Sequence, residues 1–132
     1  MGEVTGLDAC TAQVVDKEKV AAARDAMPGE RELLELTDLF RLLGDPTRAR
    51  ILYAVLEAGE LCVCDIAAAT ATAETTASHA LRLLRTAGVV VGRRSGRMMY
   101  YRLADAHVRM LLDLTREHNR EDPVPVRTRR ER

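Results

Sequence analysis

The sequence predicts a mainly α-helical fold with one β-hairpin, in the order of a helix-turn-helix followed by a hairpin wing. The composition favours helices, because 47% of the residues are apolar, only 3% are aromatic and Trp is absent, while the good helix formers Ala, Leu and Arg are abundant. A short helix, a tight turn and a longer helix are predicted between residues 62 and 87. The β-branched and aromatic residues on both sides of Ser95-Gly96 predict the hairpin.

The length and the cysteine content narrow the class of protein. At 132 residues, the chain is expected to form one domain, small enough that a homodimer interface would add useful apolar burial. No apolar run approaches the roughly 20 residues of a membrane span, and the N-terminus lacks the pattern of a secretory signal. With an odd number of cysteines, three, these features predict a cytoplasmic protein with no membrane partner.

The first 29 residues are expected to form an arm with a short helix, Lys17 to Met27, which Asp16 caps and Pro28-Gly29 ends. Residues 30–121 are expected to form the DNA-binding and dimerisation domain. Residues 122–132, with two prolines and mixed charges, are expected to be a disordered tail.

The predicted domain opens with two helices. The first, from about Glu30 to Leu43, has an apolar face broader than one intramolecular contact needs, which predicts packing on its own core and on a second copy in a homodimer. The second runs from Pro46 to about Glu57, because Asp45 is a good N-cap and Pro a good first helical residue.

The helix-turn-helix follows. A short helix is expected from about Cys62 to Ala69, and a longer one from Ala73 to Ala87 with Thr72 as its cap. Small polar residues early in the longer helix and an arginine later are typical of a helix that reads DNA in the major groove. A plain helical hairpin is the alternative. The candidate DNA contacts on this helix are Thr75, Thr76, Ser78, His79 and Arg82.

The predicted wing is basic. Val89-Val90-Val91 and Met98 to Leu103 are expected to be strands joined by a turn at residues 94–97. Residues 75–104 contain six arginines and no acidic residue, although the whole chain has no net charge. We therefore expect Arg94 and Arg97 to contact phosphates or a minor groove, the alternative being a solvated turn.

Two groups of residues have the chemistry of metal ligands. Cys62-Val63-Cys64-Asp65 places two soft donors and a carboxylate within reach of one ion, although buried core cysteines are also common. The last predicted helix, about Ala106 to Arg120 with Asp105 as its cap, contributes the second group. This group comprises Asp105, His107, His118 and Glu121.

The two histidines of the last helix cannot meet on one ion within one chain. They are 11 residues apart, so they lie on one helix face but about 16 Å apart along the axis. Two copies packed antiparallel would bring Asp105 and His107 of one chain against His118 and Glu121 of the other, a set suited to tetrahedral zinc. The alternative is a row of solvated polar residues.

Four stretches of residues 30–121 resemble one family. They are Gly44-Asp45-Pro46-Thr47-Arg48, Glu60-Leu61-Cys62-Val63-Cys64-Asp65, Ser78-His79-Ala80-Leu81-Arg82 and the strand from Arg97 to Tyr101. In this order they are similar to the ArsR/SmtB family of metal-sensing winged-helix repressors, and most similar to its cadmium, lead and zinc branch. The resemblance implies an apo dimer that binds operator DNA and is released by zinc, cadmium or lead, so that metal efflux or resistance genes are derepressed.

The resemblance also implies ligands. Cys62 and Cys64 would bind metal together with Cys10 from the arm of the other protomer, and the antiparallel helix site would be a second site. Two positions depart from the family pattern. Val14 stands where a second arm cysteine can occur, which leaves Asp65 or water to complete the thiolate site. Ala80 stands where relatives often have a longer polar residue in the recognition helix.

Two other functions are alternatives. A thiol-redox repressor of the same fold would oxidise Cys62 and Cys64, but a disulfide of this spacing is strained in a helix and the second group of ligands would be unexplained. A zinc enzyme needs an open coordination position and a general base in a cleft. The antiparallel helix site has four protein ligands and no open position, and neither site has an obvious general base in a cleft. The sequence therefore predicts a repressor and not an enzyme.

Overall fold

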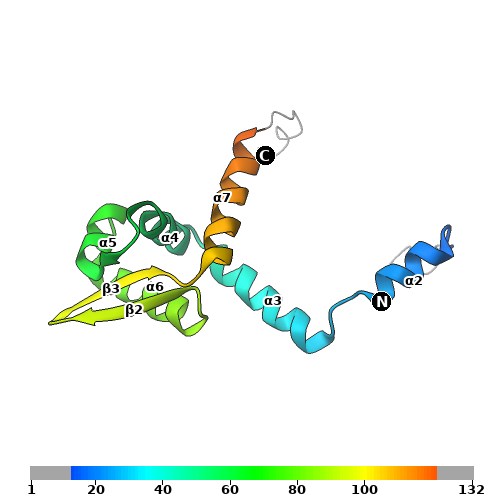
Figure 1. Cartoon of the computed structure of the whole chain (residues 1–132), viewed down its shortest axis with the longest axis horizontal. Coiled ribbons are helices and arrows are strands. Elements are labelled where there is room, and N and C mark those ends of the chain that lie inside the picture. The colour runs from blue at the N-terminus through cyan, green and yellow to red at the C-terminus, as the bar shows by residue number, and fades with distance from the viewer. Residues whose placement is uncertain (1–12, 122–132) are drawn as a thin grey trace. The chain divides into compact units, whose positions relative to one another are not determined.

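The computed structural model of the chain describes residues 13–121 and divides them between two units, which meet between Thr37 and Asp38. Each unit is described by itself. In chain order, the elements are α2 (Lys17–Asp25), α3 (Glu30–Leu43), α4 (Pro46–Ala58), β1 (Leu61–Cys62), α5 (Val63–Thr70), α6 (Glu74–Thr86), β2 (Val90–Ser95), β3 (Met98–Leu103) and α7 (Ala106–Glu121) (Figure 1). The predicted fold class, mainly helical with a hairpin wing, is confirmed.

The first unit contains α2 and the start of α3. The Asp16 side chain accepts a hydrogen bond of 3.0 Å from the backbone N–H of Lys19, as the predicted cap requires. The helix ends at Asp25 rather than at the predicted Met27. A proline disfavours the helical conformation in the residue before it, and Pro28 follows Met27 directly.

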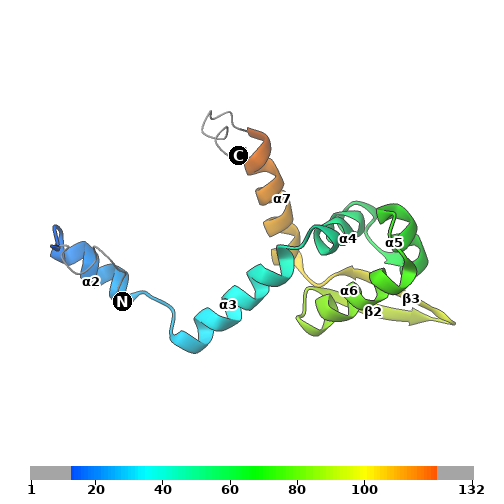
Figure 2. The same ribbon diagram turned by 180° about the vertical axis from the view of Figure 1, so that it is seen from behind.

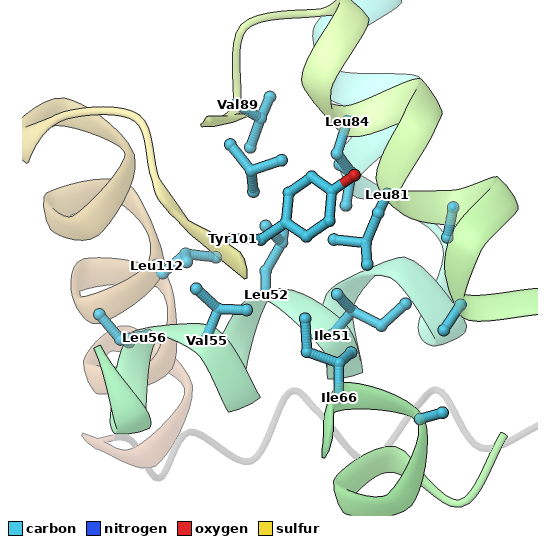
Figure 3. Packing of buried hydrophobic residues seen from close by; sticks show 14 residues of the cluster. Ile51, Leu52, Val55, Leu56, Ile66, Leu81, Leu84, Val89, Tyr101 and Leu112 are labelled. Atoms are coloured by element: carbon cyan, nitrogen blue, oxygen red, sulfur yellow. The ribbon is translucent and has the colours of Figure 1, made fainter. Parts of the chain in front are cut away.

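The second unit is built around one apolar core. The helices α4, α5 and α6, strands β2 and β3, and one residue of α7 contribute to it (Figure 3). Its largest fully buried side chains are Ile51, Leu52, Val55, Ile66, Leu81, Leu84 and Val90. Asp45 caps α4 by accepting from the Arg48 N–H at 2.9 Å. The apolar residues that face inward from α4 are all buried, namely Ile51, Leu52, Val55 and Leu56.

The sheet has a strand that the sequence does not predict. Its order is β1-β3-β2, and all pairs are antiparallel. The two-residue strand β1 pairs Leu61 with Tyr101 and Cys62 with Tyr100. The hairpin of β2 and β3 closes at Ser95 and Met98, and its tip projects away from the helices in both views (Figures 1 and 2).

Two predictions about the helix-turn-helix are wrong in detail. Cys62 is not helical, because its backbone is extended and pairs with β3, so α5 begins only at Val63. Thr72 does not cap α6 either, since Ala73 is the N-cap residue and no side chain bonds there. The Thr72 hydroxyl instead lies 3.0 Å from that of Thr70, across the turn that Ala71 makes in the left-handed conformation.

Candidate metal centre and nucleic-acid interface

The two cysteines of the segment Cys62-Val63-Cys64-Asp65, here called the box, lie side by side. Cys62 ends β1 and is the N-cap residue of α5, and Cys64 lies in the first turn of that helix. Their Sγ atoms are 3.9 Å apart, and both are free thiols. Two sulfurs on one tetrahedral zinc, each at about 2.3 Å, lie roughly 3.8 Å from each other. The pair thus has the spacing of a chelate without further movement.

The thiol pair opens onto a cleft that it shares with the helix-turn-helix and the hairpin. The cleft has a volume of about 450 Å³. It is lined by Cys62, Val63, Cys64, Glu74, Thr75, Ser78, His79, Arg82, Arg97, Met98 and Met99. Three structures therefore meet at this point: the start of α5, the outer face of α6 and the strand β3 with its turn. An ion held by the thiols would lie against the helix predicted to read DNA.

The two thiols differ in exposure and in acidity. Cys62 is only 4% exposed, whereas Cys64 is exposed. The pKa of Cys64 is raised above its ordinary value, first by its hydrogen bond with Cys62 and by the charge of that residue, then by burial and by the nearby carboxylate of Glu74. A metal has to displace the proton of this thiol in order to bind, because the thiolate is the ligand.

The third predicted thiol, Cys10, lies outside the described residues. Within residues 13–121, no three His, Cys, Asp or Glu side chains are gathered closely enough to hold an ion. Asp65 is exposed on α5 and is not among the residues that line the cleft. The described part of one chain therefore supplies two metal donors, the sulfurs of Cys62 and Cys64, at a chelating distance. A complete metal site needs further donors.

The second predicted set of ligands lies on α7 and is spread along it. The Asp105 carboxylate caps the helix by accepting from the Val108 N–H at 3.1 Å. His107 is 92% exposed, with its Nδ1 3.8 Å from Asp105 Oδ1. His118 is exposed in the last turn, and Glu121 ends the helix, although its side chain lies outside the described residues. The structure thus brings Asp105 and His107 together and leaves His118 apart from them, as one copy must.

The predicted DNA contacts lie on the surface of α6 and of the hairpin. Thr75, Thr76, His79 and Arg82 are exposed and Ser78 is partly exposed. Arg94 and Arg97 are exposed near the tip of the hairpin. Ala80 is different, because it is 5% exposed and belongs to the core. Its small side chain is a packing requirement of α6, so the departure from the family pattern at this position lies in the core and not on the exposed face of the helix.

One ion pair that the sequence does not reveal ties the box to the hairpin. Arg93 of β2 donates to both carboxylate oxygens of Glu60, at 2.9 and 3.1 Å, and its guanidinium lies 4.9 Å from the centre of the Tyr100 ring. The Arg93 hydrogen bonds lower the pKa of Glu60, against a smaller opposing effect of burial. In the sequence, the only signal for this pair is an acidic residue just before the box and a group of arginines about 30 residues later.

Comparison with known proteins identifies the same family as the sequence motifs do. Residues 45–91 match the family described as "Bacterial regulatory protein, arsR family". The chain is 36% identical over 114 residues to the cadmium resistance transcriptional regulatory protein CadC homolog of Staphylococcus aureus, covering 86% of this chain and 93% of that protein. It is 38% identical over 112 residues to the transcriptional repressor SmtB homolog of Synechocystis, covering 85% of this chain and 84% of that protein.

Solved structures agree in fold. The antimony-specific transcriptional repressor AntR is 32% identical, with a TM-score of 0.65 over 70% of this chain and 84% of AntR. The homodimeric winged helix-turn-helix DNA-binding domain of Mb0332 from Mycobacterium bovis is also 32% identical, with a TM-score of 0.64 over 75% of this chain and 97% of that domain. No helix in residues 13–121 has the length and the apolar character needed to cross a membrane. The chain belongs to the ArsR family of winged helix-turn-helix proteins, which are DNA-binding transcriptional regulators and not enzymes.

Proposed function

We propose that the chain is a metal-responsive transcriptional repressor of the cytoplasm. The apo homodimer binds operator DNA, and zinc, cadmium or lead releases it, which derepresses genes of metal efflux or resistance. The observation that carries the proposal is the pair of thiols 3.9 Å apart on a cleft shared with α6. Relatives described as cadmium-resistance regulators and as an SmtB-type repressor support a metal effector.

DNA binding follows from the exposed face of α6 and the basic hairpin. The two α6 helices of a dimer would enter successive major grooves, and the hairpins would touch the flanks. The hydroxyls of Thr75, Thr76 and Ser78, with His79 and Arg82, would contact bases or backbone. Arg94 and Arg97 would neutralise phosphates, so operator affinity should fall steeply with salt.

The homodimer is supported by apolar surface on two helices of the second unit. Phe40 is 62% exposed, and Leu114 is 59% exposed. An apolar groove of about 400 Å³ lies between the end of α3, α4 and α7, with Phe40, Leu43 and Leu111 among its lining residues. Exposed apolar surface of this kind is typical of a protein–protein contact. A second copy would cover it and would place two α7 helices against each other.

The proposal includes two metal sites, one at the box and one between the α7 helices of the two protomers. Cys62 and Cys64 would hold a soft divalent ion together with Cys10 from the other protomer. Asp105 and His107 of one α7, with His118 and Glu121 of the other, would hold zinc between the protomers. The metal would act by favouring a dimer form with the wrong spacing of the α6 helices. It can shift that balance only as far as its affinities for the two forms differ, and a coupling of about 1–3 kcal/mol would weaken DNA binding roughly 5–150-fold.

Fluorescence anisotropy of labelled operator DNA tests the proposal. Wild type should bind the operator without metal and be released by cadmium, lead or zinc. Cys64→Ser should bind the same DNA and resist release, because it removes one half of the chelate. Release that is equal in the two proteins would rule out the box as the sensor, and a matched His118→Ala titration would then show whether α7 drives release.

A second function, a thiol-redox repressor, is supported by the same pair of thiols. Peroxide would take two electrons and two protons from Cys62 and Cys64, leaving a disulfide and water. The sulfurs would have to close from 3.9 Å to the roughly 2.05 Å of a disulfide. Loss of operator binding on peroxide treatment, with no thiolate absorption band on cadmium titration, would favour this function over the first.

A further inference from the structure

The thiol pair faces a carboxylate that the sequence pattern does not select. The sequence directs attention to Asp65, which follows Cys64 directly. In the structure, however, the carboxylate on the cleft is that of Glu74, in the first turn of α6. The inference drawn below rests on the proposed function, since it concerns the same ion.

The position of Glu74 is defined by three observations. Glu74 lines the cleft together with both Cys62 and Cys64, whereas Asp65 does not. Its carboxylate lies near the Cys64 thiol. Its side chain is exposed, so it has room to turn toward the two thiols.

A soft divalent ion bound by two thiolates can also accept a carboxylate oxygen as a ligand. Zinc, and by analogy its heavier congener cadmium, accepts a carboxylate oxygen beside sulfur, at about 2.0–2.2 Å for zinc. The described chain holds only two donors in place, so another must move in. A glutamate reaches an ion by rotation about its own side-chain bonds, without a shift of the backbone. The carboxylate of Asp65 would first have to turn into a cleft that it does not line.

We infer that Glu74 supplies a carboxylate oxygen to the ion held by Cys62 and Cys64. The ion would then bond at once to the start of α5 and to the first turn of α6. Binding would pull directly on the helix that reads DNA, so the energy of the metal–carboxylate bond would be felt at the DNA interface. Glu74 would therefore contribute to metal affinity and also to release.

Two isosteric variants of the full chain test this inference. Glu74→Gln removes the carboxylate on the cleft, and Asp65→Asn removes the one beside it in sequence. Cadmium is titrated in the absence of DNA against a competing chelator, and binding is followed by the thiolate-to-cadmium absorption band. We expect Glu74→Gln to keep the band but to bind cadmium at least tenfold more weakly, the lower end of the roughly 10–100-fold that loss of an outer-shell partner costs. Asp65→Asn should stay near wild type.

Operator anisotropy gives the second readout. At saturating cadmium, Glu74→Gln should retain more operator affinity than wild type does, because the ion no longer holds α6. Cadmium affinity and release equal to wild type in Glu74→Gln would overturn the inference, as would weakening confined to Asp65→Asn. In both cases the wild type would still bind cadmium through thiolates and leave the DNA, so the proposed function would stand. A wild type without the band or without release would instead remove that function and this inference together.

Discussion

Cys62 lies opposite Tyr100 in the antiparallel pairing of β1 with β3, so the predicted box begins in a strand of the wing sheet. On one side, the box is thus tied to the hairpin by the backbone. On the other, it continues into α5 and shares a cleft with α6. We therefore expect that any movement an ion imposes on the two thiols would be passed to both α6 and the hairpin, the elements predicted to contact DNA.

The stabilisation that the Glu60–Arg93 pair contributes should be lost at low pH. The pKa of Glu60 is lowered in the folded protein by the two Arg93 hydrogen bonds. The stabilisation is therefore fully present above the ordinary glutamate pKa and is lost as the pH falls through the lowered, folded value. In an NMR titration, the chemical shift of the Arg93 Nε–H should keep the value of the hydrogen-bonded pair even below the pH at which a free glutamate titrates. It should change only as the pH falls through the lowered pKa of Glu60. Glu60→Gln should remove this transition.

The same pair should matter little for global stability. The Arg93 side chain is 55% exposed and that of Glu60 is 32% exposed, and solvent-exposed pairs contribute little to unfolding free energies. The urea midpoint of Glu60→Gln should therefore stay near that of wild type. A large drop would contradict this and would mean that the pair anchors β1 to the hairpin.

Replacement by serine should lower the stability of the protein at one of the two box cysteines and not at the other. Cys62 is buried beside β3, and the Cys64 thiol, a weak partner, is the group 3.9 Å from its sulfur, so a poorly paired buried hydroxyl in its place should cost about 1–3 kcal/mol. Cys64 is exposed, and serine there should leave stability unchanged. Urea denaturation of Cys62→Ser and Cys64→Ser would measure the difference. Equal midpoints would mean that the Cys62 site accepts a hydroxyl, and Cys64→Ser remains the cleaner variant for tests of metal-driven release.

Much of the second unit could be predicted because its signals are local. Asp45 before Pro46 sets the start of α4, and the spacing of apolar residues identifies its buried face. The strand Met98 to Leu103 has the expected bounds, and its two tyrosines favour a strand. Caps, turns and periodicity act within a few residues, so they can be read from a sequence.

The features that escaped prediction depend on residues distant in sequence. β1 has only two residues, too few for alternation to be visible, and it exists because β3 returns beside it. Glu60 finds Arg93 for the same reason. Glu74 was missed as a candidate ligand, since only the packing of α6 against α5 brings it to the cleft.

Arg97 should contribute to DNA affinity through charge alone. It is exposed at the turn of the hairpin and also borders the cleft. Arg97→Ala should weaken operator binding about equally for all sequences and reduce the slope of log affinity against log salt by about 1. Arg120→Ala, which removes the same charge from the last turn of α7, is the matched control and should leave the slope unchanged. Anisotropy titrations at several salt concentrations measure both, and an unchanged slope for Arg97→Ala would exclude it as a phosphate contact.

His118→Ala should remove zinc from the proposed site between two α7 helices. Asp105 and His107 are already adjacent, with 3.8 Å between Oδ1 and Nδ1, and they lack only the donors that a second copy would bring. Loss of His118 breaks each of two equivalent sites, so bound zinc should fall by one per protomer while the thiolate-to-cadmium band stays intact. Metal analysis after dialysis, with Cys64→Ser in parallel, separates the two sites. Unchanged zinc in His118→Ala would mean that the α7 helices do not meet in the antiparallel arrangement, and the dimer would then have to use a different face.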